Sequence, residues 1–377
     1  MCDELVLTNV RIVTTDEVVD GTLVVRDGRI AEIATGATDR AGGLDCRGDW
    51  LLPGLVELHT DNLERLFTPR VGVRWPADAA MLNHDAQIAA AGITTVGDAV
   101  CVGYHGGKSE RLEYLNLSID ALRRARAAQA LKAEHFLHLR LELADPHMLE
   151  LFEPLMHEPS LRLVSFMDHT PGQRQYRDVS RFRALHPGRS DAEVGELVAS
   201  RLRQQREHAQ GQREAVLRLM AGHQAVRASH DDTTPEHVAE AVACGCEVAE
   251  FPTTVEAAEA ARESGLHIVM GAPNLVLGGS HSGNVSAADL VERSLLDVFS
   301  SDYVPASLLQ AAFLLHEGFG LALPEAIAPV SRMPAQVLGL TDRGRIAPGL
   351  RADLVRVREV GATPTVVAVW REGRRIA

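Results

Sequence analysis

Lysine is almost absent from this chain. Only Lys108 and Lys132 are lysines among its 377 residues, and the other 36 of its 38 basic residues are arginines. Asp and Glu total 51, so the formal net charge is −13. Such an acidic chain lacks the positive surface that duplex nucleic acid or an anionic membrane attracts, so we expect neither as a partner. An anionic substrate must therefore be met locally, by metal ions or by a few arginines.

Cysteine is scarce and long apolar runs are missing. The five cysteines are odd in number and scattered, which favours free thiols in a reducing cytoplasm over a disulfide framework. Cys244 and Cys246 leave a thiolate metal site open, but no second cysteine pair exists to complete it. The first residues lack a basic segment followed by an apolar one, so we expect no secretory signal. No window of about 18 residues is both uncharged and continuously apolar, so we predict no membrane span.

The two ends of the chain are predicted to be β-structure. β-rich runs lie at 5–13, 22–26, 29–33, 353–357 and 365–370. The turn at Asp27-Gly28 is typical of a hairpin. We expect residues 1–50 and 343–377 to pair in space as one small β-sandwich domain.

The middle of the chain, residues 51–342, alternates predicted strands with Ala-rich amphipathic segments. We predict strands near 51–59, 93–99, 135–143, 161–168, 224–230, 246–251, 266–271 and 297–302, and helices that include 78–91, 115–131, 191–220 and 235–243. This α/β pattern predicts a (β/α)8 TIM barrel with insertions. A doubly wound open sheet is the alternative, but no G-x-G-x-x-G follows a predicted strand.

Two of the predicted strands have one apolar and one polar face. In the third strand four leucines face one side, while His138, Arg140 and Glu142 face the other. In the first strand His59 and Asp61 share a face. Because a polar face is costly to bury without a role, these side chains are expected to point inward at the catalytic end of a barrel. A solvated edge strand is the alternative, although the leucine face requires a helix to cover it.

Ligand-type side chains recur at the carboxyl ends of the predicted strands. His59 and Asp61 stand at i and i+2 of one strand, roughly 6–7 Å apart, so both can reach one divalent ion. The predicted ligands are His59, Asp61, Glu142, His169, His230 and Asp302. Three imidazoles and three carboxylates suit two divalent ions, with Zn, Mn, Fe or Ni as candidates. Asp168 is an alternative to His169, and Glu250 is a possible further ligand.

The scarcity of lysine also constrains this site. Neither Lys108 nor Lys132 lies at a predicted strand end. A metal site bridged by a carboxylated lysine therefore cannot be built in this barrel. Glu142 is the natural substitute, because a carboxylate can bridge two ions directly.

Several motifs resemble the amidohydrolase superfamily over the whole chain. Residues 52–59 (LPGLVELH) resemble its opening strand, 91–96 (AGITTV) its second strand, and 344–354 its return to the sheet domain. The superfamily usually has His-x-His on the first strand, whereas the third position here is Asp61. The resemblance implies a metal-dependent hydrolase. A homo-oligomer is expected of a barrel of this kind.

The departure at Asp61 suggests one branch of the superfamily. The segments 59–64, 168–173, 229–232, 271–274, 278–284 and 301–305 resemble the phosphonate-metabolism diphosphatases. This resemblance implies hydrolysis of α-D-ribose 1-methylphosphonate 5-triphosphate to the 5-phosphate and pyrophosphate, within the carbon–phosphorus lyase pathway. A small phosphorylated sugar is thus the expected substrate.

Two regions carry groups that suit a polyphosphate. The loop 278–284 offers backbone N–H groups and polar side chains, from which we select Gly279, Ser280, His281 and Asn284. Arg140, Arg174 and Arg177 offer guanidinium forks for phosphate oxygens. An ordinary glycine-rich connection and a solvated basic stretch are the alternatives for these two regions.

Asp302 is the predicted catalytic base. We expect it to orient a metal-activated water and take its proton as hydroxide attacks phosphorus in line. Cleavage of an amide or deacetylation of an N-acetyl sugar is the alternative reaction, but it would not need the arginines and the glycine-rich loop together. A barrel without catalysis would be expected to have lost ligands, and none of the six is lost.

Overall fold

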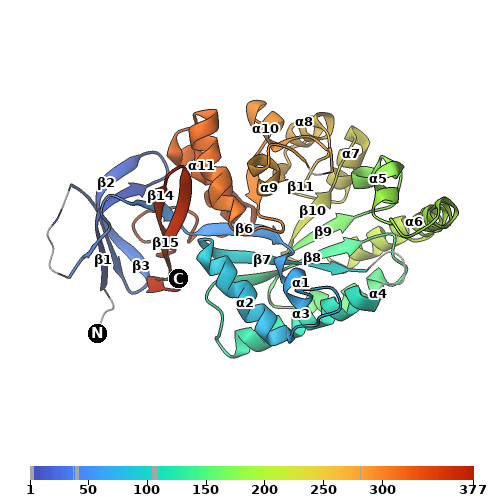
Figure 1. Cartoon of the computed structure of the whole chain (residues 1–377), viewed down its shortest axis with the longest axis horizontal. Coiled ribbons are helices and arrows are strands. Elements are labelled where there is room, and N and C mark those ends of the chain that lie inside the picture. The colour runs from blue at the N-terminus through green and yellow to red at the C-terminus, as the bar shows by residue number, and fades with distance from the viewer. Residues whose placement is uncertain (1–3, 37, 39–41, 104–108, 281) are drawn as a thin grey trace. The chain divides into compact units, whose positions relative to one another are not determined.

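The computed structural model of the chain contains two β-sheets (Figure 1). It describes residues 4–36, 38, 42–103, 109–280 and 282–377, with only the backbone described at 109–111. One sheet has eight parallel strands. The other is mostly antiparallel and is built from both ends of the chain.

The parallel sheet follows chain order from its first strand to its last. Its strands are β6 (Leu55–Thr60), β7 (Ile93–Val102), β8 (Glu134–Glu142), β9 (Leu161–Met167), β10 (Val226–His230), β11 (Val248–Glu250), β12 (His267–Gly271) and β13 (Val298–Ser300). A parallel bridge between Thr60 and Asp302 joins the end of β6 to the segment after β13, so the sheet is nearly closed. The predicted TIM barrel is confirmed, because an open doubly wound sheet would have a rearranged strand order.

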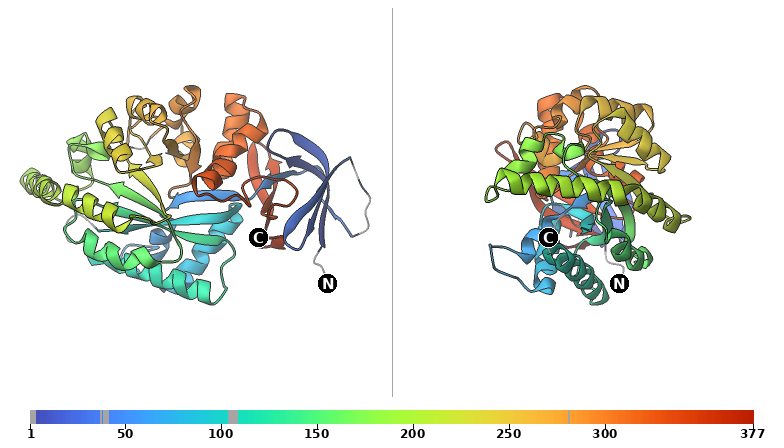
Figure 2. Two further views of the ribbon diagram at one scale, coloured as in Figure 1. Left: turned by 180° about the vertical axis from the view of Figure 1, so that it is seen from behind. Right: turned by 90° about the vertical axis from the view of Figure 1, so that its right-hand side faces the viewer.

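Helices connect the strands of this barrel. They are α1 (Asn62–Phe67), α2 (Ala77–Ala90), α3 (Ser109–Ala127), α4 (Met148–Phe152), α5 (Val179–Ala184), α6 (Asp191–Leu219), α7 (Pro235–Ala243), α8 (Val255–Glu263), α9 (Ala272–Val276), α10 (Ala287–Glu292), α11 (Ser307–Phe319), α12 (Leu323–Ile327) and α13 (Arg332–Val337). The long helix α6, visible in Figure 2, begins at a capping box formed by Ser190 and Glu193. Helices α7 and α8 each begin after a threonine, Thr234 and Thr254, whose side-chain hydroxyl accepts a backbone N–H of the first turn.

The terminal sheet comprises β1–β5 and β14–β16, in the order β16-β15-β14-β5-β1-β2-β3, with β4 beside β1. Its strands are β1 (Glu4–Val13), β2 (Val18–Arg26), β3 (Arg29–Thr35), β4 (Leu44–Asp45), β5 (Trp50–Pro53), β14 (Leu354–Val360), β15 (Thr363–Arg371) and β16 (Arg374–Arg375). Strand β5 pairs with β1 on one side and with β14 on the other. The expectation that both chain ends share one sheet is therefore confirmed.

By compactness the chain divides into two units. The first comprises Met1–Val96, Leu122–His135 and Asp297–Ala377, and the second comprises Gly97–Ala121 and Phe136–Leu296. The first unit contains the terminal sheet, β6 and β13, and the second contains β9 to β12. The domain boundaries at 50/51 and 342/343 stay a prediction, since these units divide the barrel itself.

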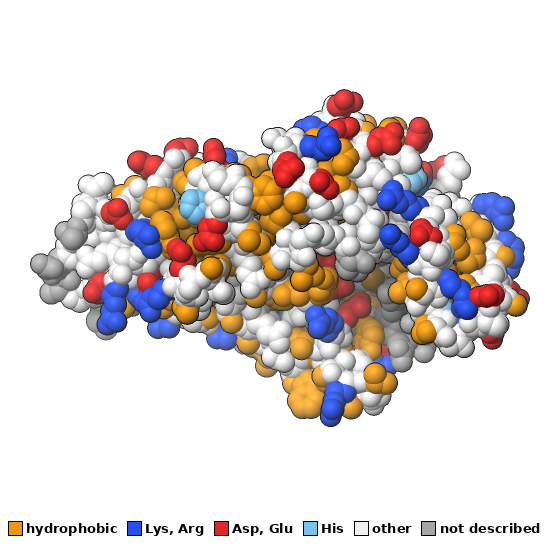
Figure 3. Space-filling model, turned by 45° about the horizontal axis from the view of Figure 1, so that its top comes forward, with side chains coloured by type: hydrophobic (Ala, Val, Ile, Leu, Met, Phe, Trp, Pro, Cys, Tyr) orange, Lys and Arg blue, Asp and Glu red, His pale blue; other side chains and the backbone are white. Residues whose placement is uncertain are grey.

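The surface of the described residues is mixed in charge. On the face that Figure 3 presents, Lys and Arg side chains are interspersed with Asp and Glu side chains. Within the described part of the chain, no helix combines the length and the apolar character needed to cross a membrane.

A buried carboxylate holds the two ends of the chain together in the terminal sheet. Asp49, 5% exposed, accepts hydrogen bonds from Arg356 Nε at 2.5 Å and from Arg358 Nε and Nη2 at 2.8 and 2.9 Å. Burial raises the pKa of Asp49, but the hydrogen bonds and charges of Arg358 and Arg356 outweigh burial and hold the pKa below its ordinary value. Arg356 is itself buried, so its charge depends on this carboxylate.

Replacing Asp49 should therefore destabilise the terminal sheet. We expect Asp49→Asn to lower the free energy of unfolding by about 3 kcal/mol at pH 7, because it leaves the Arg356 charge buried without its counter-ion. The matched control is Glu4→Gln, which removes the exposed partner of Arg26 and should cost less than about 1 kcal/mol. Urea titrations followed by tryptophan fluorescence compare the two, since Trp50 and Trp370 lie in this sheet.

The stabilisation that Asp49 provides should depend on pH. The folded pKa of Asp49 is lowered, so its contribution is present above the unfolded value of about 3.9 and is lost as the pH falls through the folded pKa. The difference between wild type and Asp49→Asn should therefore shrink in acid. A difference that stays constant down to pH 3 would contradict the role of the carboxylate charge.

Candidate functional site

Strained backbone follows three strands of the barrel. Asp231, Phe251 and Asp302 have positive φ angles of 56°, 57° and 53°. Asp231 and Phe251 come directly after β10 and β11, and Asp302 is the second residue after β13. Non-glycine residues rarely adopt this conformation, and it concentrates at functional sites. The strained residues therefore mark the carboxyl ends of these strands as the candidate functional site.

In the second unit, two histidines are each held by a carboxylate. His169 Nδ1 lies 2.6 Å from Glu142 Oε2, and the His169 backbone N–H donates to Glu142 Oε1 at 3.1 Å. His230 Nδ1 lies 2.6 Å from Glu250 Oε2. Since an ionised carboxylate only accepts, each Nδ1 donates, and in the neutral ring Nε2 then has the lone pair that can bind a metal. Metal-binding histidines are usually oriented in this way.

Asp231 lies close to the Nε2 atoms of both histidines. Its Oδ2 is 3.6 Å from His169 Nε2 and 3.5 Å from His230 Nε2. This oxygen is buried and accepts no hydrogen bond, and the three ligand atoms lie within 4.8 Å of one another. Two imidazoles and a carboxylate are the donors that Zn and similar divalent ions take in proteins. The residues present therefore fit a divalent metal.

The electrostatics of this cluster also favour a cation. Burial by itself lowers the pKa of His169, but the charges of Glu142 and Asp231 and the hydrogen bond to Glu142 outweigh burial and raise that pKa to about 9. Burial raises the pKa of Asp231, and the neighbouring His230, His169 and Arg140 more than reverse this. A site that stabilises imidazolium so strongly is equally suited to a metal cation.

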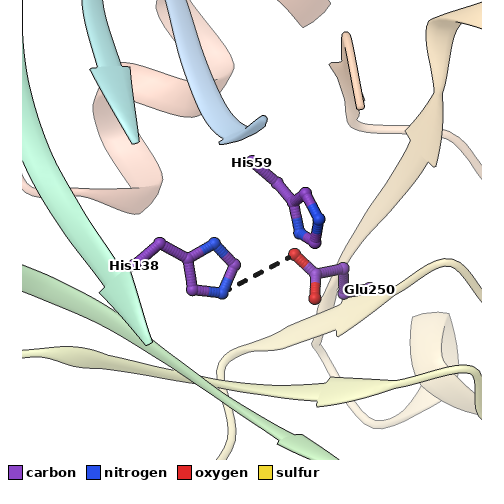
Figure 4. A group of neighbouring side chains, drawn as sticks. All are labelled: His59, His138 and Glu250. Atoms are coloured by element: carbon purple, nitrogen blue, oxygen red, sulfur yellow. Dashed lines mark ion pairs between the residues drawn. The ribbon is translucent and has the colours of Figure 1, made fainter. Parts of the chain in front are cut away.

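A second buried pair extends the network on the side of Glu250. His138 Nε2 lies 2.6 Å from Ser165 Oγ, which donates to Glu250 Oε2 at 3.0 Å. His138 Nε2 and Glu250 Oε1 also form the 4.0 Å ion pair drawn in Figure 4, where His59 is labelled as well. Glu250, predicted as a further ligand, thus orients His230 and contacts His138.

In the first unit, the ends of β6 and β13 are tied together by backbone hydrogen bonds. Asp61 N–H donates to Asp302 O at 3.1 Å, and Asp302 N–H donates to His59 O at 3.2 Å. Thr60 Oγ1 donates to Asp302 O at 2.7 Å, and Ser300 Oγ donates to His59 O at 2.5 Å. These bonds bring three predicted ligands, His59, Asp61 and Asp302, to one edge of the unit. Asp61 Oδ1 is buried and accepts no hydrogen bond.

Glu57 supports this edge from inside the first unit. Its Oε1 accepts the His59 N–H at 2.7 Å, and its Oε2 accepts the Ser301 N–H at 2.6 Å. Complete burial raises the pKa of Glu57 to about 7, although the hydrogen bonds from Ser301 and His59 offset part of the rise. The side chain therefore holds the backbone that carries His59.

The six predicted ligands are thus divided equally. His59, Asp61 and Asp302 come together in the first unit, and Glu142, His169 and His230 come together in the second. Asp231 is the ligand-type residue that sequence reasoning missed. It lies directly after His230 within the motif 229–232, but the positive φ that turns it toward the histidines is visible only in the structure. Asp168, the predicted alternative to His169, is buried and accepts the Thr170 N–H at 3.1 Å.

The predicted anion-binding arginines have different surroundings. Arg140 is partly buried on β8, and its charge contributes to the lowered pKa of Asp231. Arg177 is exposed. Arg174 is 6% exposed, and its guanidinium donates to Asp232, Glu240 and the His230 carbonyl. Its predicted phosphate contact therefore competes with three protein acceptors.

The glycine-rich loop is folded on itself where it is described. The Gly279 N–H donates to Asn274 O at 2.8 Å, and the Ser282 N–H donates to Ser280 Oγ at 3.2 Å. Asn284 Oδ1 is buried without a hydrogen bond. His281 lies outside the described residues. Among the described side chains of this loop, Asn284 is therefore the one with a buried polar atom that makes no hydrogen bond.

The cysteine alternative gains no support. Burial raises the pKa of both the Cys244 and Cys246 thiols, which opposes thiolate formation. Among the described residues, no group of three potential metal ligands includes either sulfur. Buried free thiols account for these two residues.

The chain resembles known proteins over its whole length. No protein-family model matches the chain. Over 377 residues, however, the chain is 45% identical to the alpha-D-ribose 1-methylphosphonate 5-triphosphate diphosphatase of Escherichia coli, covering 99% of this chain and 100% of the relative. A dihydroorotase of Methanopyrus kandleri is 38% identical over a short stretch, 18% of this chain and 21% of its own length.

Solved structures share the fold at low sequence identity. A 5-methylcytosine deaminase from Klebsiella pneumoniae has a TM-score of 0.65 and 16% identity, covering 99% of this chain and 97% of its own. An amidohydrolase structure has a TM-score of 0.60 and 18% identity, covering 99% and 98%. These likenesses establish the fold alone, and the match over the full length to the Escherichia coli enzyme establishes the family. The chain is therefore a hydrolase with the amidohydrolase fold, and it belongs to the alpha-D-ribose 1-methylphosphonate 5-triphosphate diphosphatase family.

Proposed function

We propose that this hydrolase cleaves α-D-ribose 1-methylphosphonate 5-triphosphate to the 5-phosphate and pyrophosphate. The printed name of the Escherichia coli relative supports this substrate, and the identity of 45% extends over 99% of the chain. The six segments that resemble the phosphonate-metabolism diphosphatases support the same reaction. We also propose that the enzyme acts in the cytoplasm as a homo-oligomer.

We propose two divalent metal ions, with zinc as the first candidate, held by His59, Asp61, Glu142, His169, His230 and Asp302 together with Asp231. The observation that carries this proposal is Asp231 Oδ2, a buried oxygen without a hydrogen bond beside two histidine Nε2 atoms. Glu250 orients His230 and is a further candidate ligand. When bound, such ions supply Lewis-acid chemistry, which acidifies a water and neutralises phosphoryl charge.

Asp302 is the proposed catalytic base. Hydrogen bonds at its N–H and its carbonyl fix its backbone in the left-handed conformation, so its carboxylate is preorganised. A water oxygen forms a bond to phosphorus and passes its proton to this carboxylate. The anhydride bond between the α- and β-phosphoryl groups breaks, and pyrophosphate leaves with the bonding electrons.

The substrate-binding groups complete the proposal. Arg140 and Arg177 are proposed to meet phosphate or phosphonate oxygens, since guanidinium forks suit both. Gly279, Ser280, His281 and Asn284 are proposed to bind the polyphosphate from the glycine-rich loop. Asn284 has an unused buried Oδ1 in support of this role. Arg174 was predicted with this group, but its hydrogen bonds to Asp232, Glu240 and the His230 carbonyl favour a different role.

Product analysis tests the reaction directly. We expect phosphorus NMR of the zinc-loaded protein with α-D-ribose 1-methylphosphonate 5-triphosphate to show pyrophosphate and a 5-monophosphate as the sole products. Orthophosphate would mean that the terminal phosphate is removed and would contradict the proposal. If the zinc-loaded protein leaves the triphosphate intact but deacetylates an N-acetyl sugar phosphate, the alternative reaction replaces the proposed one.

The role of Asp302 predicts a loss of turnover without loss of metal. We expect Asp302→Asn to lower kcat about 1,000-fold while most of the zinc stays bound, because the amide keeps the shape of the side chain but cannot take a proton. Stopped-time pyrophosphate assays and metal analysis measure the two effects. The control is Asp16→Asn, an exposed carboxylate in the terminal sheet turn, which should keep full activity. Full activity of Asp302→Asn would remove Asp302 from the role of base.

The role of Asp231 as a metal ligand predicts that its replacement weakens zinc binding, unlike the replacement of Asp302. We expect Asp231→Asn to weaken zinc binding at least about 10-fold, because a charged ligand atom is lost between two imidazoles. Zinc titration against a competing chelator measures the affinity in the absence of substrate. An unchanged zinc affinity would mean that His169 and His230 do not share a metal with Asp231.

A further inference from the structure

A buried arginine lies behind the candidate metal cluster in the second unit. Arg174 stands in the turn after β9, with a positive φ of 48°. Its Nη1 donates to the His230 carbonyl at 2.9 Å and to Asp232 Oδ1, and its Nη2 donates to Glu240 Oε2 at 3.2 Å. We refer to Arg174, Asp232 and Glu240 as the Arg174 clamp.

Each partner in the clamp is anchored by another element. Asp232 also accepts a hydrogen bond from Ser229 Oγ on β10. Glu240 on α7 also accepts from Arg213 on α6. The clamp therefore connects the turn after β9 with the end of β10 and with two covering helices. Such a network is rigid when all of its members are satisfied.

The carboxylates of the clamp stabilise the positive charge of Arg174. Burial lowers its pKa, but the charges of Asp232, Asp168 and Glu240 and the hydrogen bond to Asp232 outweigh burial and raise that pKa. Both Nη1 hydrogens have protein acceptors, so a phosphate that used Nη1 would have to displace the buried Asp232 carboxylate or the His230 carbonyl. Because three of its hydrogen bonds are made to protein acceptors, the surroundings of Arg174 favour a structural role over a direct phosphate contact.

The contact to His230 gives the clamp a role. The His230 carbonyl belongs to the peptide that leads into Asp231, whose positive φ turns its carboxylate toward the two histidines. Such a conformation is costly and persists only when neighbouring groups hold it. The charged hydrogen bond from Arg174 Nη1 is such a group.

We propose that Arg174 is a positioning residue that holds His230 and Asp231 in the arrangement that binds metal. This inference rests on the metal centre of the proposed function, and it assigns Arg174 to that centre rather than to the substrate. It predicts that loss of Arg174 weakens metal binding and leaves substrate binding unchanged once metal is saturating.

The test compares two arginines that share Glu240, the buried Arg174 and the partly buried Arg213. Arg174→Met removes the contacts to His230 and Asp232, whereas Arg213→Met removes only a contact to Glu240. We expect the zinc Kd of the full chain, measured by competition with a chelator, to rise about 10- to 100-fold in Arg174→Met. In Arg213→Met we expect a zinc Kd close to that of wild type.

Kinetics separate positioning from substrate binding. At saturating zinc, KM for the triphosphate should be the same in Arg174→Met as in wild type, because the variant retains the groups that contact substrate. A raised KM with unchanged zinc affinity would make Arg174 a substrate ligand and overturn the proposal. Equal zinc affinities in Arg174→Met and Arg213→Met would overturn it as well.

A conservative variant covers the case in which Arg174→Met does not fold. Arg174→Lys keeps the buried charge but cannot reach all three acceptors, so its zinc affinity should fall by a smaller factor. Unchanged affinity in Arg174→Lys, with Arg174→Met unfolded, would count against positioning. If wild type binds zinc but does not cleave the triphosphate, the proposed reaction fails, while the zinc affinities still decide the role of Arg174.

Discussion

The pairing of buried imidazoles with buried carboxylates is the constraint on which this site depends. Glu142 and Glu250 are taken out of water, and an isolated buried carboxylate is very costly. Each is stabilised by the Nδ1–H of a histidine, and each fixes the orientation of that ring. Because the carboxylates use Nδ1, the Nε2 atoms of His169 and His230 face Asp231. The chemistry of the site follows from how the fold satisfies its own buried charges.

Elsewhere in the chain, buried carboxylates are paired with arginines instead of histidines. Asp49 is paired with Arg356 and Arg358 in the terminal sheet, and Asp232 is paired with Arg174 behind the metal cluster. A planar guanidinium can serve two or three acceptors at once, which a lysine ammonium does less well in a buried site. The near absence of lysine is thus consistent with a protein that uses its cations as internal connectors.

The first unit builds its half of the predicted ligand set from backbone geometry. His59, Asp61 and Asp302 are brought together because the end of β6 and the segment after β13 exchange main-chain hydrogen bonds. Glu57 adds a side-chain link between the same two segments. The second unit instead relies on contacts between side chains. In both units the ligand-type residues stand just where the strands end, as expected of a TIM barrel.

The sequence by itself determined the barrel, the terminal sheet and the strand ends at which the chemistry lies. Those features follow from local patterns: alternating and apolar runs predict strands, and motifs such as residues 59–64 and 168–173 carry the family resemblance. All eight predicted barrel strands are present, and both chain ends share one sheet. Only the tertiary structure decided what Asp231 and Arg174 contact. Asp231 reaches two histidines because a left-handed turn redirects it, and Arg174 is enclosed by carboxylates that come from different elements. Neither a backbone turn nor a long-range ion pair leaves a periodic signal in the sequence, because both depend on residues that meet only when the chain is folded.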